Sequence, residues 1–290
     1  MSAVAATATP REIVYRLRHG ASGYFPGAHR SRHGDTGMEF RAHRPLLSGG
    51  DPRRLDIHAS LRDPMRQWWV RVNAERMAVP VVVLADVSGS MGFEGRQRRG
   101  QVLAEFTESL AWSAQRMGDA FAFIGADAGL PPALQQWPTR QRGAGLALGA
   151  ALRQHSFDGP ASHSAEGLRL AAAMVPHQRS LVFLVSDFHW PDALLASVMD
   201  ALAGHEVVPV VLWDRSEFQL PARNGLAWLA DSEGAGHRLL WLRPALRQRW
   251  ANRLDGARGA LEEKLQRWRV RPLFLLDGFD ADAVTAYFHA

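Results

Sequence analysis

The stretch MAVPVVVLADVSGSMG, residues 77–92, joins an apolar run to a turn rich in side-chain oxygens. Its apolar part, residues 79–85, is dominated by β-branched side chains and is typical of a strand buried on both faces. The turn that follows carries Asp86, Ser88 and Ser90 with glycines among them. Because such a strand belongs in a parallel sheet covered by helices, the stretch predicts an α/β fold.

The same alternation of strand and helix patterns continues towards the C-terminus. Further apolar runs predict strands at residues 120–124, 181–186, 207–213 and 272–276. Apolar side chains at helical spacing predict helices at residues 103–117, 165–174, 191–202, 244–268 and 281–288. We therefore expect a mainly parallel sheet flanked by helices, with a helix, a strand and a helix closing the chain.

Two parts of this pattern are weaker. The runs at 226–229 and 238–242 are short and surround a polar loop, which favours a hairpin at the edge of the sheet. Residues 125–160 contain several prolines and little periodicity, so only a short helix at 146–153 is predicted there.

The composition excludes several classes of protein. Of the 290 residues, 47% are hydrophobic and 22% are charged, which is typical of a globular chain and not of a disordered or collagen-like one. The absence of cysteine excludes disulfides and thiolate metal sites. No apolar run reaches the roughly 18 residues that span a bilayer, and the opening residues lack a secretory pattern. We expect a soluble, cytoplasmic protein without a membrane partner.

The first part of the chain differs from the rest in charge and in residue composition. Residues 1–80 contain 13 arginines against 7 acidic side chains, whereas residues 81–290 contain 21 basic and 22 acidic ones. Residues 1–76 are also rich in glycine and histidine, which favours short strands and turns over helices. We expect this segment to pack on an α/β domain formed by residues 77–290, with the boundary near residues 75–77.

The oxygen-bearing side chains after two strands predict a metal site. Asp86, Ser88 and Ser90 stand at alternate positions in one loop, and Asp187 follows the apolar run 181–186. If these two strands are neighbours, the side chains converge at the carboxyl ends of the strands, where open α/β sheets bind ligands. Mg²⁺ prefers such oxygen ligands, and Mn²⁺ or Ca²⁺ would also suit them. Two carboxylates neutralise the ion and leave a coordination position for an acidic residue of a partner.

The motif DVSGSM, followed by a Ser-Asp pair at a later strand end, resembles the metal-ion-dependent adhesion site (MIDAS) of von Willebrand factor type A domains. The resemblance implies a further Ser or Thr ligand from a middle loop. The stretch ASHSAEGL offers Ser162 or Ser164 for this role, and Ser164 also suits the N-cap of the helix that follows. The resemblance thus implies a magnesium site made by Asp86, Asp187 and serine hydroxyls.

A longer resemblance covers the chain from about Gly34 to Asp231. The stretches GDTGMEFRAHRPLLSGGDPRRLDIHASLR and VRVNAERMAVPVVVLADVSGSM are similar to the bacterial family called domain of unknown function 58. The matching residues are Gly37, Glu39, Phe40, Arg44, Gly50, Asp51, Arg53, Asp56, Arg62, Arg71, Glu75 and Arg76. Ile57 departs from the family, which usually has Trp there. The resemblance implies a type A domain that acts with a MoxR-type AAA+ ATPase.

Simpler interpretations compete with the metal site. Asp86 and Ser90 could cap the helix that begins near Gly100, and Asp187 could cap the helix near Pro191. Five histidines between residues 19 and 58 suggest zinc, but nothing in the sequence brings three or four of them together. No phosphate-binding loop and no serine-hydrolase elbow is present.

From the sequence, we expect a non-enzymatic adaptor that binds an acidic residue of a MoxR-type ATPase, or of its protein client, through Mg²⁺. The alternative is a metal-dependent hydrolase that uses the same carboxylates to activate water. Its weakness is that His189 is the only histidine near the motif that could serve as a base. Nucleic-acid binding by the arginines of residues 41–76 is disfavoured because acidic residues are interleaved with them.

Overall fold

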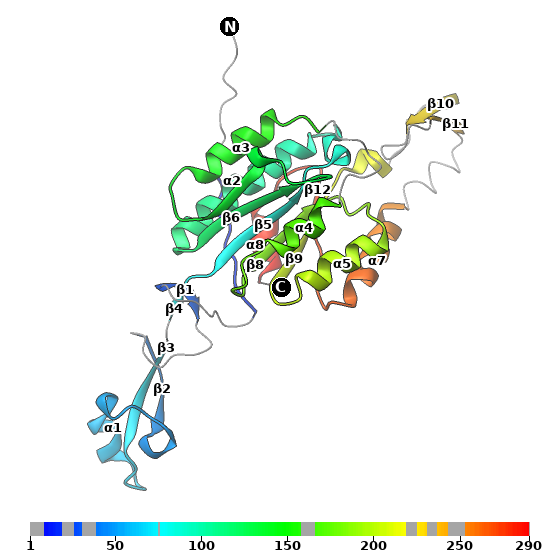
Figure 1. Cartoon of the computed structure of the whole chain (residues 1–290). Helices are drawn as coiled ribbons and strands as arrows, with labels where there is room; N and C mark the ends of the chain where they lie inside the picture. Colours follow the sequence, from blue (N-terminus) through cyan, green and yellow to red (C-terminus); the bar gives the residue numbers. More distant parts are fainter. Residues whose placement is uncertain are drawn as a thin grey trace.

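The computed structural model of the chain describes residues 9–18, 26–30, 39–74, 76–157, 166–218, 225–230, 237–242 and 253–289. Its centre is a six-stranded sheet in the order β12-β9-β8-β5-β6-β7 (Figure 1). The strands are β5 (Pro80–Asp86), β6 (Ala120–Ala126), β7 (Gln135–Thr139), β8 (Leu181–Ser186), β9 (Glu206–Trp213) and β12 (Leu273–Leu276). All neighbours are parallel except β6 and β7. The predicted α/β fold with a mainly parallel sheet is confirmed.

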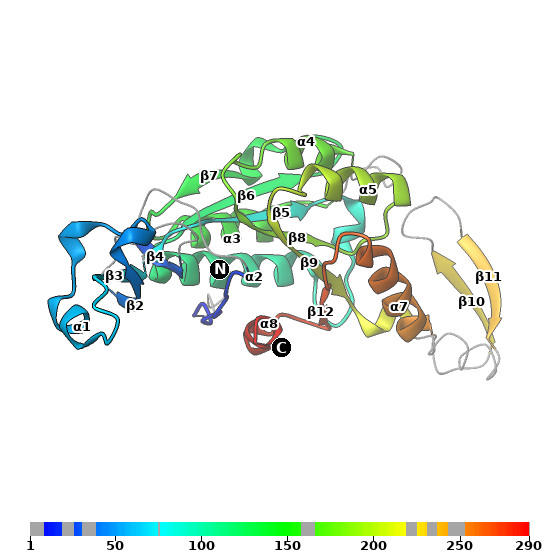
Figure 2. The same cartoon turned by 90° about the horizontal axis from the view of Figure 1, so that it is seen from below.

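Helices cover both faces of this sheet (Figure 2). One face packs against α2 (Arg99–Met117), α3 (Ala144–Gln154) and α8 (Ala281–Tyr287), and the other against α4 (Gly167–Ala173), α5 (Asp192–Ala201) and α7 (Arg253–Gln266). β5 is buried along its whole length because its side chains alternate between the two cores. Val81, Val83 and Ala85 join one apolar cluster, while Val82 and Leu84 join the other.

Two elements differ from the sequence prediction. The hairpin, β10 (Gly225–Ala230) with β11 (His237–Leu242), pairs only within itself, so its predicted place at the sheet edge is wrong. β12 occupies that edge beside β9. The opposite edge is β7, which the sequence analysis missed because the stretch QQWPT has no apolar alternation and contains a proline, which only an edge strand tolerates. Residues 243–252 of the predicted helix 244–268 lie outside the described residues.

Residues 9–18 lie against the sheet domain through a buried polar cluster. Ile13 and Tyr15 are buried in the apolar core of the α2 face. Asp119 accepts hydrogen bonds from the Tyr15 hydroxyl at 2.6 Å and from the backbone N–H of Val79 at 2.9 Å. Its Oδ2 also lies 2.8 Å from Nε2 of His29. This one carboxylate therefore ties two N-terminal segments to the start of β5.

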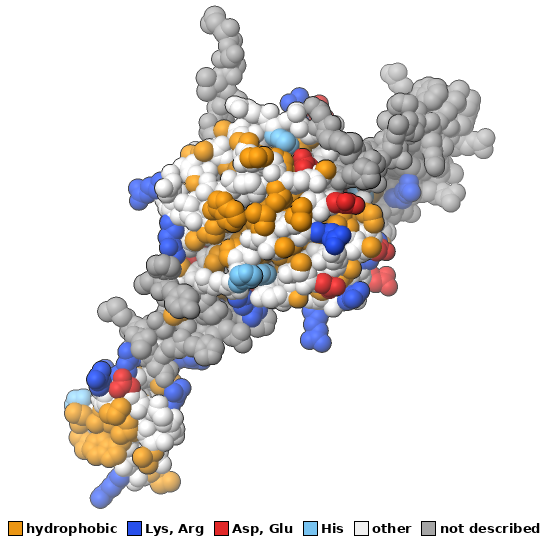
Figure 3. Space-filling view, in the orientation of Figure 1, with side chains coloured by type: hydrophobic (Ala, Val, Ile, Leu, Met, Phe, Trp, Pro, Cys, Tyr) orange, Lys and Arg blue, Asp and Glu red, His pale blue; other side chains and the backbone are white. Residues whose placement is uncertain are grey.

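The middle of the N-terminal segment forms a separate small unit. It consists of β2 (Glu39–Pro45), β3 (Trp69–Ala74) and α1 (Ile57–Arg62), and it stands away from the sheet in Figure 1. The connection runs through β1 (Pro26–Arg30), which pairs with β4 (Arg76–Met77). Among the described residues of this segment, Tyr15 and His29 contact the large domain through Asp119. Figure 3 shows hydrophobic side chains on one face of this unit. Its exposed large apolar residues are Phe40, Leu47, Ile57, Leu61, Met65 and Trp68.

Close packing of α2 on α3 depends on Gly145. A Cβ atom at this position would lie 2.4 Å from the Cβ of Ala111. Gly145→Val is therefore expected to destabilise the protein by about 1–3 kcal/mol, since the two helices must move apart. Urea unfolding measures the loss. Gly204→Val is the control because a Cβ there meets no atom within 4 Å; equal losses in both variants would contradict the packing argument.

Candidate metal centre

The carboxyl ends of β5 and β8 bring the two predicted carboxylates together. The strands are adjacent and parallel, with Ala85 opposite Val185, which confirms the expectation that they are neighbours. Ser186, the last residue of β8, donates its hydroxyl to Oδ2 of Asp86 at 2.7 Å and lies 3.5 Å from Oδ1 of Asp187. Both carboxylates thus face one hydroxyl group.

The motif loop folds so that its two hydroxyls meet beside Asp86. Oδ1 of Asp86 accepts the backbone N–H of Ser88 at 2.9 Å. The chain then turns into the short 3-10 helix η3 (Gly89–Gly92), which leaves the hydroxyls of Ser88 and Ser90 3.3 Å apart. Three of the predicted ligands therefore lie together. Ser162 and Ser164 lie outside the described residues, so the choice between them stays a prediction.

Asp86 is a buried carboxylate whose bonding partners are all uncharged in the described part of the chain. Besides Ser88 and Ser186, Oδ2 accepts the indole N–H of Trp190 at 2.9 Å. Burial, together with the negative charge of Asp187, raises the pKa of Asp86 to about 6. A buried carboxylate without a counter-charge is unfavourable, so the site fits a cation bound at Asp86.

Asp187 differs from Asp86 because cationic side chains contact it. Oδ2 lies 3.0 Å from Nη1 of Arg99 and 3.4 Å from Nδ1 of His189, and Oδ1 accepts the backbone N–H of His189 at 3.2 Å. Burial acts to raise the pKa of Asp187, but the hydrogen bond and charge of His189 and the charge of Arg99 outweigh it and lower that pKa. The same contact raises the pKa of His189 against the effect of burial. Asp187 is therefore ionised over the whole neutral range.

Arg99 is a buried residue of the site that the sequence analysis missed. Its Nη1 donates to the backbone oxygen of Ser90 at 2.8 Å as well as to Asp187, and its Nη2 donates to Oε2 of Glu217. Glu217 belongs to the 3-10 helix η6 (Arg215–Phe218) after β9. The stretch RQRRG offers three arginines, and only the fold distinguishes Arg99 from its two neighbours.

The donor set suits a hard cation. In the part of the chain that the structure describes, no three His, Cys, Asp or Glu side chains form a metal-binding group, so a site for zinc is not indicated. The oxygens of Asp86, Ser88 and Ser90, with Asp187 beside them, are instead of the kind that Mg²⁺ prefers. These four residues would hold the ion, which would supply a positive charge with open coordination positions.

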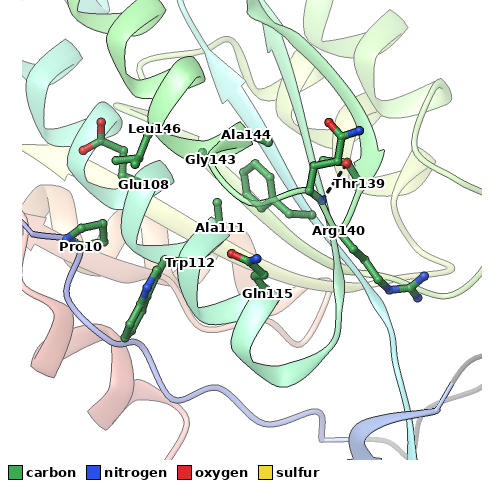
Figure 4. Close-up of a pocket in the computed structure, with 13 residues that line it drawn as sticks. Pro10, Glu108, Ala111, Trp112, Gln115, Thr139, Arg140, Gly143, Ala144 and Leu146 are labelled. Atoms are coloured by element: carbon green, nitrogen blue, oxygen red, sulfur yellow. Dashed lines mark hydrogen bonds between the residues drawn. The ribbon is translucent and has the colours of Figure 1, made fainter.

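A cavity of about 470 Å³ opens beside the motif loop. It is lined by η3, the first turns of α2 and the end of α3, including Met91, Arg98, His155 and Phe157. Figure 4 shows a second cavity, of about 50 Å³, between α2, α3 and the loop after β7, with Trp112 and Thr139 among its walls. The second cavity is too small for an organic ligand. Another cavity, of about 420 Å³, lies in the small N-terminal unit beside Asp56 and Arg71, so the cavity of about 470 Å³ is the larger of these two spaces and the one that adjoins the motif.

The family called protein of unknown function DUF58 matches residues 42–259, well over half of the chain. The chain belongs to this family. The match confirms the resemblance that the sequence suggested on either side of the Asp86 motif. The DUF58 protein also has the predicted α/β fold, a mainly parallel sheet flanked by helices, with the motif directly after the central strand β5. No curated protein matches the chain.

Solved structures similar to the DUF58 protein include three proteins from bacteria. The hypothetical protein BatB from Bacteroides thetaiotaomicron is 14% identical over 73% of this chain and 96% of its own, with a TM-score of 0.42. The pilus adhesin SpaC from Lactobacillus rhamnosus GG is 14% identical over 73% of this chain and 29% of its own, with a TM-score of 0.41. An aerotolerance-related membrane protein from Bacteroides fragilis is 13% identical over 66% of this chain and 100% of its own, with a TM-score of 0.36. At these values the likenesses support no conclusion about function.

Among the described residues of the DUF58 protein, no helix combines the length and the apolar character that crossing a membrane requires.

The metal-free DUF58 protein is expected to lose stability as the pH rises from about 4 to about 6. The pKa of Asp86 is raised from 3.8 to about 6 on folding, so in this window the folded state holds a proton that the unfolded state has released. The free energy of unfolding then falls with pH, by ~3 kcal/mol for a shift of this size. Asp187 affects the pH dependence in the opposite direction, because folding lowers its pKa. Its ionised form stabilises the folded state, and this stabilisation is lost only when the pH falls below the ordinary pKa of an aspartate.

Urea unfolding in EDTA, at several pH values between 4.5 and 7, measures this effect. Other carboxylates titrate in the same range, so the informative quantity is the difference between the wild type and Asp86→Asn, which keeps every other group. The difference is expected to change steadily through the window. A constant difference would show that Asp86 titrates normally in the folded state.

Proposed function

We propose that this DUF58 protein is a metal-dependent protein-protein interaction module. Asp86, Ser88 and Ser90 hold a Mg²⁺ ion, with Asp187 bound to it directly or through water, and the ion binds an acidic residue of a partner. The observation that carries this proposal is the buried Asp86 carboxylate, which faces two serine hydroxyls and, among the described residues, has only uncharged hydrogen-bond partners. Mn²⁺ or Ca²⁺ would bind through the same oxygens.

The geometry beside the motif supports a partner that approaches from outside. Asp86 and Ser88 are buried, but Ser90 is partly exposed, so the ion would lie at the boundary between protein and solvent. The cavity of about 470 Å³ adjoins η3, and its wall contains Arg98, Arg153 and His155 against one acidic side chain, Glu94, which pairs with Arg98. The excess of basic groups suits an acidic segment. Mg²⁺ commonly keeps coordination positions for water or an outside carboxylate.

We assign the partner by family resemblance as a MoxR-type AAA+ ATPase or a protein that this ATPase remodels. The interaction is placed in the cytoplasm, where such ATPases work, and the DUF58 protein itself catalyses no reaction. The arginine-rich N-terminal segment, residues 1–76, provides a second contact surface for the same partner.

The direct test is binding of a purified MoxR-type ATPase from the same organism, measured by biolayer interferometry. Binding is expected in Mg²⁺, with a loss of at least ~10-fold in affinity in EDTA, because the bridging ion supplies a central contact. Asp86→Asn should show the same loss of affinity for the ATPase even when Mg²⁺ is present. Asp192→Asn is the matched control, since Asp192 is exposed and pairs only with Lys264 among described residues. Affinity that is unchanged by EDTA and by Asp86→Asn would contradict the proposal.

The second candidate is a metal-dependent hydrolase. One observation favours it, because Nδ1 of the half-exposed His189 lies 3.4 Å from Asp187, an arrangement that can hold a histidine as a general base. A screen with p-nitrophenyl phosphate and related esters in Mg²⁺ separates the two functions. Turnover that disappears in both Asp86→Asn and His189→Ala would favour the hydrolase, whereas the interaction module is expected to show none.

A further inference from the structure

Arg99 places a permanent positive charge inside the proposed cation site. Its side chain is 5% exposed, and its two terminal nitrogens contact the loops that follow β5, β8 and β9, through Ser90, Asp187 and Glu217. The ring of Phe93 lies against the guanidinium, with 4.9 Å between Cζ and the ring centroid. The guanidinium therefore holds the three loops together in the absence of a metal ion.

The position of Arg99 conflicts with full use of Asp187 by a metal ion. Oδ2 of Asp187 already accepts from Nη1 of Arg99 at 3.0 Å, so a cation bound at this oxygen must share the oxygen with the guanidinium or displace it. Nε of Arg99 is buried without a hydrogen-bond partner in the described part of the chain. This N–H group therefore does not help to hold the guanidinium in place. A guanidinium and a divalent ion also repel each other strongly in a buried site.

We propose that Arg99 and the divalent cation compete for Asp187, so that Arg99 limits the affinity of the site for the cation and Glu217 partly offsets this limit. This inference rests on the metal site of the proposed function, but it does not depend on the identity of the partner. Arg99 is a positioning residue in this scheme, because it acts on the cation through Asp187 and through its charge.

The formal charges explain the direction of each effect. Asp86, Asp187 and Glu217 are negative and Arg99 is positive, which gives a net charge of −2 that a divalent ion neutralises. Removing the charge of Arg99 changes the sum to −3, and removing that of Glu217 changes it to −1. His189 and Asp214 also lie close to these groups, and every variant leaves both unchanged.

The experiment is a calorimetric Mg²⁺ titration of the full chain at pH 7.5, on the wild type and four variants. Arg99→Met is expected to bind Mg²⁺ at least ~10-fold more tightly than the wild type, and Glu217→Gln ~10-fold more weakly. Arg99→Lys keeps the positive charge but not all the contacts of the guanidinium, so its affinity for Mg²⁺ should lie closer to the wild type than to Arg99→Met. The double variant Arg99→Met/Glu217→Gln has the wild-type sum of −2, and its affinity should return close to the wild-type value.

Opposite results identify a different role for Arg99. If Arg99 only shaped the site, Arg99→Met would weaken Mg²⁺ binding, and this result would overturn the competition. Should Arg99→Met fail to fold, Glu217→Gln still decides, because unchanged or tighter binding in that variant contradicts the scheme. If neither the wild type nor Arg99→Met binds Mg²⁺, the proposed function fails together with this inference. If the wild type binds Mg²⁺ but Arg99→Met binds it more weakly and Glu217→Gln more tightly, this inference fails and the proposed function stands.

Discussion

Saturating Mg²⁺ is expected to raise the free energy of unfolding of the wild-type protein by roughly 2.7 kcal/mol at ~100 times its dissociation constant. The gain arises because the ion binds the folded arrangement of Asp86, Ser88 and Ser90 and not the unfolded chain. For a domain of this size it corresponds to a rise of several degrees in the melting temperature. Differential scanning calorimetry with Mg²⁺ and with EDTA measures it.

Asp86→Asn should remove this stabilisation while leaving the fold intact. The amide cannot replace the charge of the carboxylate, although it can still bond to Ser186 and Trp190. The exposed Asp192→Asn variant should keep the whole effect of Mg²⁺. An equal stabilisation of Asp86→Asn and the wild type would place the ion elsewhere on the protein.

Asp119→Ala is expected to cost about 3–5 kcal/mol of stability, the largest effect of any single substitution considered. The carboxylate is fully buried, and its removal leaves the Tyr15 hydroxyl and the Val79 N–H without their acceptor. Burial, the largest cause of the raised pKa of Tyr15, persists in this variant, so the hydroxyl stays protonated as a buried donor without an acceptor. Urea unfolding monitored by tryptophan fluorescence measures the loss.

Tyr15→Phe is the graded control for this cluster. It removes one hydrogen bond and leaves Asp119 with its other partners, so a smaller loss of about 1–2 kcal/mol is expected. Cleavage by a protease near residues 9–18 should also become faster in Asp119→Ala than in Tyr15→Phe, because this segment loses its anchor. A cost below about 1 kcal/mol for Asp119→Ala would mean that the apolar contacts of Ile13 and Tyr15 hold the segment alone.

The sequence was sufficient to predict the sheet and the convergence of Asp86 with Asp187. Strands buried on both faces appear as short continuous runs rich in β-branched residues and bounded by turns, and parallel strands bring their carboxyl ends to one edge of the sheet. The elements that were missed or misplaced are those whose signal is weak. β7 is a polar edge strand. The sequence of the β10–β11 hairpin contains no feature that shows whether it pairs with the large sheet.

The residues that surround the two carboxylates were beyond sequence reasoning. The site receives Arg99, Glu217 and Trp190 from three segments of the chain that are more than 25 residues apart. The sequence around each of them contains no motif that points to the site. Their roles depend on which loops share an end of the sheet, and this follows only from the strand order. The same holds for Asp119, whose partners come from residues 15, 29 and 79.

The most direct test of the metal site is a crystal structure of the protein grown in Mn²⁺, with anomalous diffraction data that locate the ion. We predict one strong peak within about 2.1–2.4 Å of the hydroxyl oxygens of Ser88 and Ser90, with Asp86 and Asp187 around it. A well-ordered structure with these side chains in place and no anomalous peak among them would contradict the metal site and the function proposed from it.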